Sequence, residues 1–275
     1  MSILTSILRP LFDALLFPFH SLHPMVGLSV ASLVVTVLVL LVLKVTSNQE
    51  KIEQVKRKIH AGLFEIRLFN DNPLAIMRAQ GDILRHNVTY LWLWMIPLLW
   101  LIVPLVLILG QLQFHYGYRG LEPGEQALVT VELKEAPEAK PAVELEVPEG
   151  LEVETRPVWI PSLGELTWRI GAREWGDYEI GVTVDGTTYP KAVQVSSDVR
   201  RRSPVRPDPS FGSQLLYPAE APLPADAPIR SISVSYPAGN AGFSGWEWEL
   251  TWMVILFLLT IVFALVLRKP MGVTF

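Results

Sequence analysis

The chain has 275 residues, half of them apolar, with no cysteine and a formal net charge of −4 at pH 7. The lack of cysteine excludes disulfides, thiolate metal sites and cysteine nucleophiles. The small net charge hides a strong asymmetry along the chain, and we expect no DNA partner. His20 and His23 are the one histidine pair near metal-ligand spacing, and we interpret them as interfacial loop residues. We therefore predict no metal and no cofactor.

Residues 1–22 predict an amphipathic helix that lies in the outer membrane interface. Leu4, Leu8, Leu11 and other apolar residues recur at helical spacing along this segment. A signal peptide is the alternative. We disfavour it because the segment has no early cluster of positive charge and no small-residue cleavage site.

Three uncharged apolar runs predict transmembrane helices, at residues 25–43, 90–112 and 250–267. Each run is long enough to cross a hydrocarbon core of about 30 Å at about 1.5 Å per residue. Trp246, Trp248 and Trp252 form an aromatic belt at the start of the last span.

Charge predicts how these spans are oriented. Segment 44–89 holds eight basic against five acidic residues, whereas segment 113–249 holds twelve basic against twenty-one acidic residues. Because basic loops stay in the cytoplasm, we place 44–89 and the tail 268–275 inside and 113–249 outside. The expected compartment is the cell inner (plasma) membrane, with the N-terminus outside and the C-terminus in the cytoplasm.

Segment 44–89 predicts a charged coiled-coil helical hairpin between the first two spans. Its turn lies at residues 70–73, where Asn72 can cap the second arm and Pro73 can occupy its first position. Apolar residues follow alternating steps of three and four in both arms. The expected seam consists of Ile52, Val55, Ile59, Ile66, Phe69, Met77 and Leu84.

From residue 119 the apolar pattern changes to period two, with turn residues between short runs. This predicts an extracytoplasmic all-β sandwich at 119–196. Residues 197–248 are rich in proline and predict a linker with one additional strand near 229–236. The fold class is thus an α-helical integral membrane protein with three spans, a cytoplasmic hairpin and an external β-sandwich.

No catalytic constellation is present, so we predict that the chain is not an enzyme. Two clusters are candidates for other sites. Ser29, Ser32 and Thr36 share one face of the first span, where they either pack against a neighbouring helix or line a wet groove. The run Arg200, Arg201, Arg202 is either a solvated part of the linker or a contact for anionic lipid headgroups.

The order of these elements resembles the YidC/Oxa/Alb superfamily of membrane protein insertases, and its three-span members in particular. The stretch from Leu43 to Ile52, where a span runs into the hairpin, looks like the family junction. The resemblance implies a polar groove open to the cytoplasm, lined by Ser29, Ser32 and Thr36, and a hairpin that captures the incoming chain. The chain departs from bacterial members in having no arginine in mid-membrane and in its β-domain between the last two spans.

Two functions follow from these patterns. The first is a membrane protein insertase or membrane chaperone that offers a polar groove to incoming transmembrane segments. Its partners would be membrane lipids, nascent membrane proteins and a ribosome at the hairpin. The second is a membrane-anchored binding or scaffold protein that holds an envelope protein at its β-domain.

Overall fold

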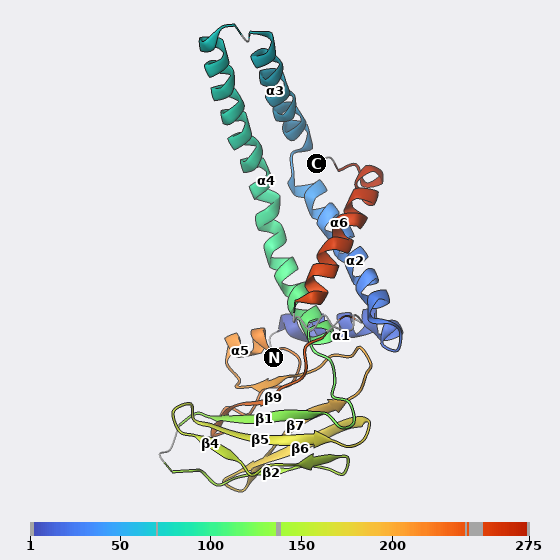
Figure 1. Ribbon diagram of the computed structural model, residues 1–275, viewed down its shortest axis with the longest axis vertical. Helices are drawn as coiled ribbons and strands as arrows, with labels where there is room; N and C mark the ends of the chain where they lie inside the picture. Colours follow the sequence, from blue (N-terminus) through green and yellow to red (C-terminus); the bar gives the residue numbers. More distant parts are fainter. Residues whose placement is uncertain (1–2, 70, 136–138, 240, 242–249, 274–275) are drawn as a thin grey trace. The chain divides into compact units, whose positions relative to one another are not determined.

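The computed structural model describes residues 3–69, 71–135, 139–239, 241 and 250–273, with side chains from Arg9 onward. The chain forms two compact units (Figure 1). The β-unit comprises Met1–Leu28 and Leu109–Ile255, and the helical unit comprises Ser29–Ile108 and Leu256–Phe275.

Three helices are long and apolar enough to cross a membrane, which identifies a membrane protein by length and composition: α2 (Pro24–Thr46), α4 (Pro73–Tyr116) and α6 (Thr251–Met271). The helices α2 and α4 contain the first two predicted spans, and α6 covers the third apart from Leu250. Of the predicted aromatic belt, Trp246 and Trp248 lie outside the described residues.

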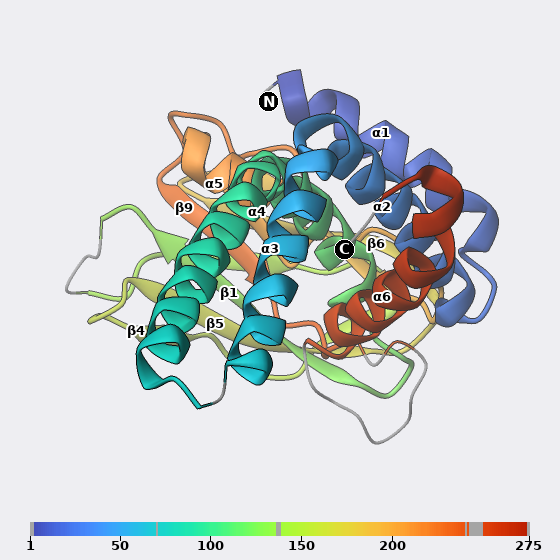
Figure 2. The ribbon, with the colours of Figure 1, turned by 90° about the horizontal axis from the view of Figure 1, so that it is seen from above.

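The hairpin of the helical unit consists of α3 (Gln49–Leu68) and the first half of α4, which lie side by side in Figures 1 and 2. Asn48 caps α3 by accepting a hydrogen bond from the Lys51 backbone N–H at 3.0 Å. Asn72 caps α4, because its side chain accepts from the backbone N–H groups of Leu74 and Ala75 at 3.1 and 3.2 Å. The predicted cap with Pro73 at the first helical position is thereby confirmed.

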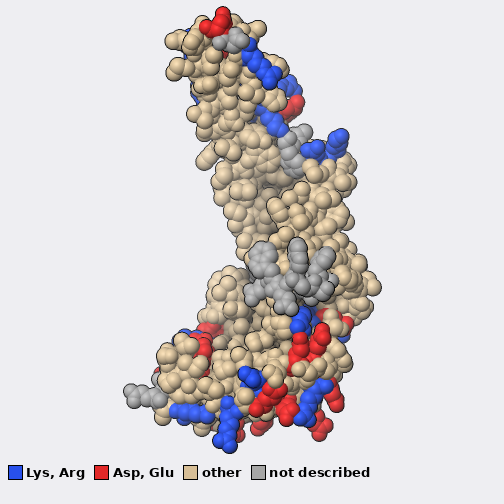
Figure 3. Space-filling model, in the orientation of Figure 1, with Lys and Arg blue, Asp and Glu red and all other residues tan. Residues whose placement is uncertain are grey.

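The spans of the helical unit share a small apolar core. Leu40 and Leu43 of α2 pack with Leu101 of α4 and with Val273, which follows α6. On the face shown in Figure 3, the charged side chains of this unit gather at the hairpin and near the C-terminal end, and the surface of its spans shows none. This distribution is the one that a hydrocarbon environment requires.

The β-unit contains two antiparallel sheets around one core, which confirms the predicted all-β part of the fold. The six-stranded sheet has the order β3-β5-β1-β9-β8, with β4 also paired to β5, and the three-stranded sheet has the order β2-β6-β7. The strands are β1 (Gln126–Leu133), β2 (Val143–Glu146), β3 (Leu151–Val153), β4 (Val158–Ile160), β5 (Glu165–Ala172), β6 (Gly176–Val184), β7 (Thr187–Val195), β8 (Val205–Pro207) and β9 (Ile229–Val234).

The sequence pattern explains these strands. In β1, the residues Ala127, Val129 and Val131 alternate inward, as period two requires. The turn between β6 and β7 is the pair Asp185-Gly186, with φ of 52° and 78°. Two consecutive positive φ angles are the hallmark of a two-residue hairpin turn, and glycine accepts that geometry without a steric penalty.

The additional strand predicted near 229–236 is confirmed as β9, but the residues before it are more ordered than the linker that their prolines predict. Segment 197–248 contributes β8, the short helix α5 (Phe211–Leu216) and β9, and β9 pairs with β1 in the middle of the large sheet. Pro207 fits β8 because an edge strand leaves one side of its backbone unpaired. The β-domain therefore extends well beyond residue 196.

A buried ion pair holds part of this segment in place. The Lys191 ammonium on β7 is fully buried and lies 2.6 Å from the Glu220 carboxylate. It also donates to the Ser203 carbonyl at 2.6 Å. Burial lowers the pKa of Lys191, and the adjacent Glu220 carboxylate opposes that shift.

The β-unit also contains the N-terminal helix α1 (Ile3–Leu16) and a 3₁₀ turn (Phe17–Phe19). Phe12 and Leu16 are buried, whereas Leu11 and Phe17 are exposed, so apolar side chains cover more than one face of this segment. Its predicted position in the membrane interface stays a prediction.

Candidate functional site

The polar stripe of the first span is buried in helix packing. Ser32 and Thr36 are 0% exposed. The Thr36 hydroxyl donates to the Ser32 carbonyl at 2.7 Å and lies 3.5 Å from the Thr260 carbonyl of α6. Small hydroxyl residues let two membrane helices approach closely, so the packing interpretation holds for this pair. The prediction that Ser32 and Thr36 line a wet groove is therefore wrong. Ser29, the third residue of the predicted groove, is partly buried.

A groove does exist in the helical unit, but it is lined by other residues. It encloses about 900 Å³ between the C-terminal turns of α2 and the middle of α4. This is near the upper end of the volumes typical of ligand pockets, about 300–1,000 Å³. Its lining carries no charge and one hydroxyl: Leu41, Val42, Val45, Thr46, Leu99, Trp100, Val103 and Pro104. The groove is therefore apolar, in contrast to the predicted polar groove.

Pro104, which lines this groove, changes the backbone hydrogen bonding of α4. Proline has no N–H, so the Trp100 carbonyl loses its usual helical donor four residues later. The Thr46 hydroxyl is held within α2, where it donates to the Val42 carbonyl at 2.6 Å. The groove thus has apolar walls, and one of its lining residues has a carbonyl group without its usual helical donor.

The arms of the hairpin contact each other along a seam that matches the prediction in α3 only. Ile52 is buried, and Val55, Ile59 and Ile66 are partly buried. At the end of this arm, Phe69 is exposed, so its assignment to the seam is wrong.

In α4 the predicted seam is wrong, because Met77 and Leu84 are 70% and 68% exposed. The residues that turn inward are Ile76, Ala79 and Ile83. A Cβ atom added at Gly62 would lie 2.6 Å from Ile83 Cγ1 and 3.7 Å from the Ala79 carbonyl oxygen. Because Gly62 allows this close approach, α4 packs on α3 through the face of Ala79 and Ile83 rather than through the predicted face.

The displaced seam is instead an exposed apolar stripe, which we call the α4 stripe. Its residues follow steps of four and three, the spacing with which one helix packs against another. It extends about 38 Å at 1.5 Å per residue. Within the described chain all of its positions stay exposed: Met77, Gly81, Leu84, Val88, Leu91, Met95, Leu98 and Ile102.

The α4 stripe links the hairpin to the groove, since Leu98 and Ile102 neighbour the groove residues Leu99 and Val103 in sequence. The sequence-based seam included only two residues of this stripe, Met77 and Leu84. The same seven-residue spacing continues to Ile102, but the uniformly apolar span conceals it.

The arginine run is built into the β-unit. Arg202 is 2% exposed, and its guanidinium donates to the backbone carbonyls of Tyr118 and Ser196 at 3.2 and 3.0 Å. Burial lowers the pKa of Arg202 to about 10, which leaves it charged at neutral pH. The predicted headgroup contact is therefore wrong for Arg202.

Arg201 is also occupied within the β-unit, because its guanidinium lies 2.9 Å from the Asp13 carboxylate and 2.8 Å from the Gln111 side-chain oxygen. Its side chain is 9% exposed, so a headgroup contact is excluded in this arrangement. Arg200 is half-buried and is the most accessible member of the run, and it pairs with Asp177 and Asp198 at 3.2 and 3.0 Å.

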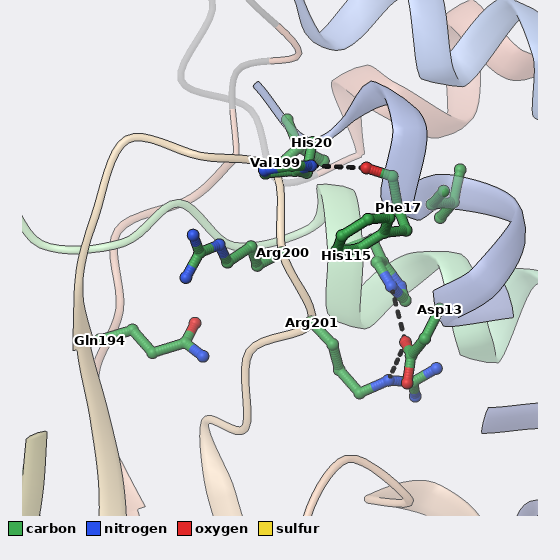
Figure 4. A pocket seen from close by; sticks show the side chains of 9 residues that line it. Asp13, Phe17, His20, His115, Gln194, Val199, Arg200 and Arg201 are labelled. Atoms are coloured by element: carbon green, nitrogen blue, oxygen red, sulfur yellow. Dashed lines mark hydrogen bonds and ion pairs between the residues drawn. The ribbon is translucent and has the colours of Figure 1, made fainter. Parts of the chain in front are cut away.

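Arg201 belongs to a cluster at the edge of a cavity of about 450 Å³ within the β-unit (Figure 4). His115 of α4 lies 3.2 Å from Asp13 through Nε2 and 3.1 Å from the Gln111 carbonyl through Nδ1. Burial raises the pKa of Asp13, but hydrogen bonds from His115 and Arg201 outweigh burial and lower it overall. Asp13, Arg200 and Arg201 all have charged partners, so the cluster connects α1, α4 and residues 199–202 rather than presenting an unpaired charge.

Among the described residues, no group of three or more His, Asp or Glu side chains could hold a metal ion. Comparison with known proteins identifies no relative, since no family model, curated protein or solved structure matches this chain. The function must therefore be argued from the groove and the α4 stripe.

Proposed function

We propose that this chain is a non-enzymatic membrane insertase or membrane chaperone that holds a transmembrane segment of a client protein against α4. The observation that carries the proposal is the α4 stripe. Large exposed apolar patches on soluble surfaces mark interaction sites, and the Met77–Val88 part of the stripe lies on a charged hairpin. An apolar helix is the partner that this spacing fits.

The α4 groove supplies the second step of the proposed path. A client helix captured at Met77 and Leu84 remains on one continuous helix as it moves towards Leu98 and Ile102. At the apolar groove beside Val103, the client helix exchanges its contacts with water for contacts with side chains and lipid. Burial of the client's apolar surface is favourable by about 0.8 kcal/mol for each CH₂ group that leaves water.

The charge distribution supports the orientation in this proposal. The basic hairpin lies in the cytoplasm, where newly made chains emerge, and the acidic β-unit lies outside. The hairpin then receives clients or a ribosome, and the spans deliver the client to the lipid. The polar hydroxyls of Ser32 and Thr36 take no part, because they are enclosed in packing.

Site-specific photo-crosslinking tests the proposal. A photoreactive residue is placed at Leu84 or Leu98 on the stripe, and at Ile83 on the arm contact as the control. Stalled ribosomes present an emerging transmembrane segment in native membranes. We expect crosslinks to the client from Leu84 and Leu98 and none from Ile83. Crosslinks from the stripe only to lipid or to a second copy of the chain would contradict the proposal.

A further inference from the structure

The short helix α5 presents large apolar side chains on the surface of the β-unit. Phe211 and Leu216 are 72% and 70% exposed, and Leu215 is also exposed. The helix contains no charged residue. A folded domain rarely places three such side chains together on its surface without a contact for them.

The helix is held firmly by its surroundings. Ser210 caps it, since the Ser210 hydroxyl accepts from the Ser213 backbone N–H at 3.3 Å. The Gln214 side chain donates to the Pro209 carbonyl at 2.7 Å. After the helix, Pro218 and Ala219 are buried. The apolar side chains are therefore displayed by a fixed support.

The contacts around α5 place it on the side of the β-unit where the chain enters its spans. The Arg9 guanidinium of α1 donates to the Ala219 carbonyl at 2.9 Å. The Arg202 backbone N–H, shortly before β8, donates to the Phe114 carbonyl of α4 at 2.8 Å. Figures 1 and 2 both show α5 beside the N-terminal part of α1.

The ends of all three long helices lie on this same side. Within the β-unit, the Trp252 indole of α6 donates to the Gln113 side chain of α4 at 3.1 Å. Gly27 of α2 packs so closely on Tyr116 that an added Cβ would lie 2.4 Å from its hydroxyl oxygen. A membrane crossed by these helices therefore begins at this side of the β-unit.

We propose that α5 is a second lipid anchor, which inserts Phe211, Leu215 and Leu216 into the interfacial region of the leaflet that the spans enter. A membrane surface fits better than a protein because the α1 segment of the same unit also exposes large apolar side chains, Leu11 and Phe17. Aromatic and aliphatic side chains of a short uncharged helix suit this depth. The anchor holds the β8 edge of the large sheet against the bilayer. This inference does not depend on the proposed function.

Because the chain has no cysteine, single spin labels can test the anchor in the full-length protein. Gly212→Cys is the reporter, since Gly212 is exposed, an added Cβ meets nothing within 4 Å, and all three apolar side chains stay in place. The control is Val158→Cys on β4, which is 59% exposed at the opposite edge of the sheet. Four strand spacings of about 4.8 Å separate β8 from β4, about 19 Å.

The labelled proteins are reconstituted in phosphatidylcholine–phosphatidylglycerol nanodiscs, and collision rates with oxygen and with a water-soluble nickel chelate are compared. At Gly212 we expect oxygen to dominate, and at Val158 we expect the nickel chelate to dominate. Adding Phe211→Ser and Leu216→Ser should convert the Gly212 signal to the Val158 pattern. Equal accessibility at the two sites, or shielding of Gly212 from both reagents as a protein contact produces, would overturn the inference.

Discussion

The contact between the hairpin arms makes a quantitative prediction at two glycines of the helical unit. At Gly62 an added methyl group would lie 2.6 Å from Ile83 Cγ1, whereas at Gly81 it meets nothing within 4 Å. Replacing either glycine by alanine improves helix propensity by about 0.8–1.0 kcal/mol. This gain cancels when Gly62→Ala is compared with Gly81→Ala.

The remaining difference is the cost of forcing a methyl group into the arm contact, typically about 1–3 kcal/mol. We therefore expect the arms of Gly62→Ala to open about 5-fold to 140-fold more often than those of Gly81→Ala. Amide hydrogen exchange of α3 in the full-length protein measures this opening, and the amides of β1 and β5 serve as the internal control.

Equal exchange of α3 in the two variants would refute this reasoning, and so would greater opening in Gly81→Ala. Either result would mean that Gly62 does not lie at the arm contact. The predicted seam through Met77 and Leu84 would then have to be restored, and the α4 stripe would lose its basis.

Three further outcomes follow from the structure. Arg202→Met should destabilise the β-unit by about 3 kcal/mol or more in denaturant titration, because the partly buried Tyr118 and Ser196 carbonyls lose their donor. Arg200→Met, at a half-buried side chain whose ion pairs reach solvent, should cost less than about 1 kcal/mol. The lowered pKa of Asp13 means that its carboxylate stabilises the fold above its unfolded pKa of about 3.9, and that this contribution disappears as pH falls through the folded value. The mobility of a spin label at Leu11→Cys should therefore rise in acid, and Asp13→Asn should make it independent of pH in that range. Thr36→Val should leave client insertion unchanged and lower the free energy of unfolding by about 0.6 kcal/mol. A large loss of insertion would mean that the hydroxyl residues of the first span take part in the function.

The sequence predicts the long helices and the main strands well, because both depend on local periodicity. Charge-free runs mark α2, α4 and α6, and alternating residues mark strands such as β1 and β5. The Asn72 cap was also predictable, since its donors lie within three residues.

The errors concern contacts between distant parts of the chain. Two apolar faces compete on the second arm, and only the position of Gly62 on the first arm decides between Ile83 and Leu84. The prolines of 197–228 suggest a linker, yet this segment forms α5 and the strand β8, which pairs with the predicted strand β9. Nothing local indicates that Arg201 meets Asp13 or that the Arg202 guanidinium donates to the Ser196 carbonyl six residues earlier.

The central claim is that the α4 stripe delivers transmembrane segments to the lipid. Purified protein in liposomes, supplied with a client that has one transmembrane segment, tests this claim by protection of the client from protease. We predict that the protein raises the protected fraction above that of empty liposomes. Leu84→Glu, on the stripe, should abolish the gain, whereas Gln80→Glu, an exposed position off the stripe that receives the same charge, should preserve it. A wild-type protein no better than empty liposomes, or equal effects of the two substitutions, would contradict the account.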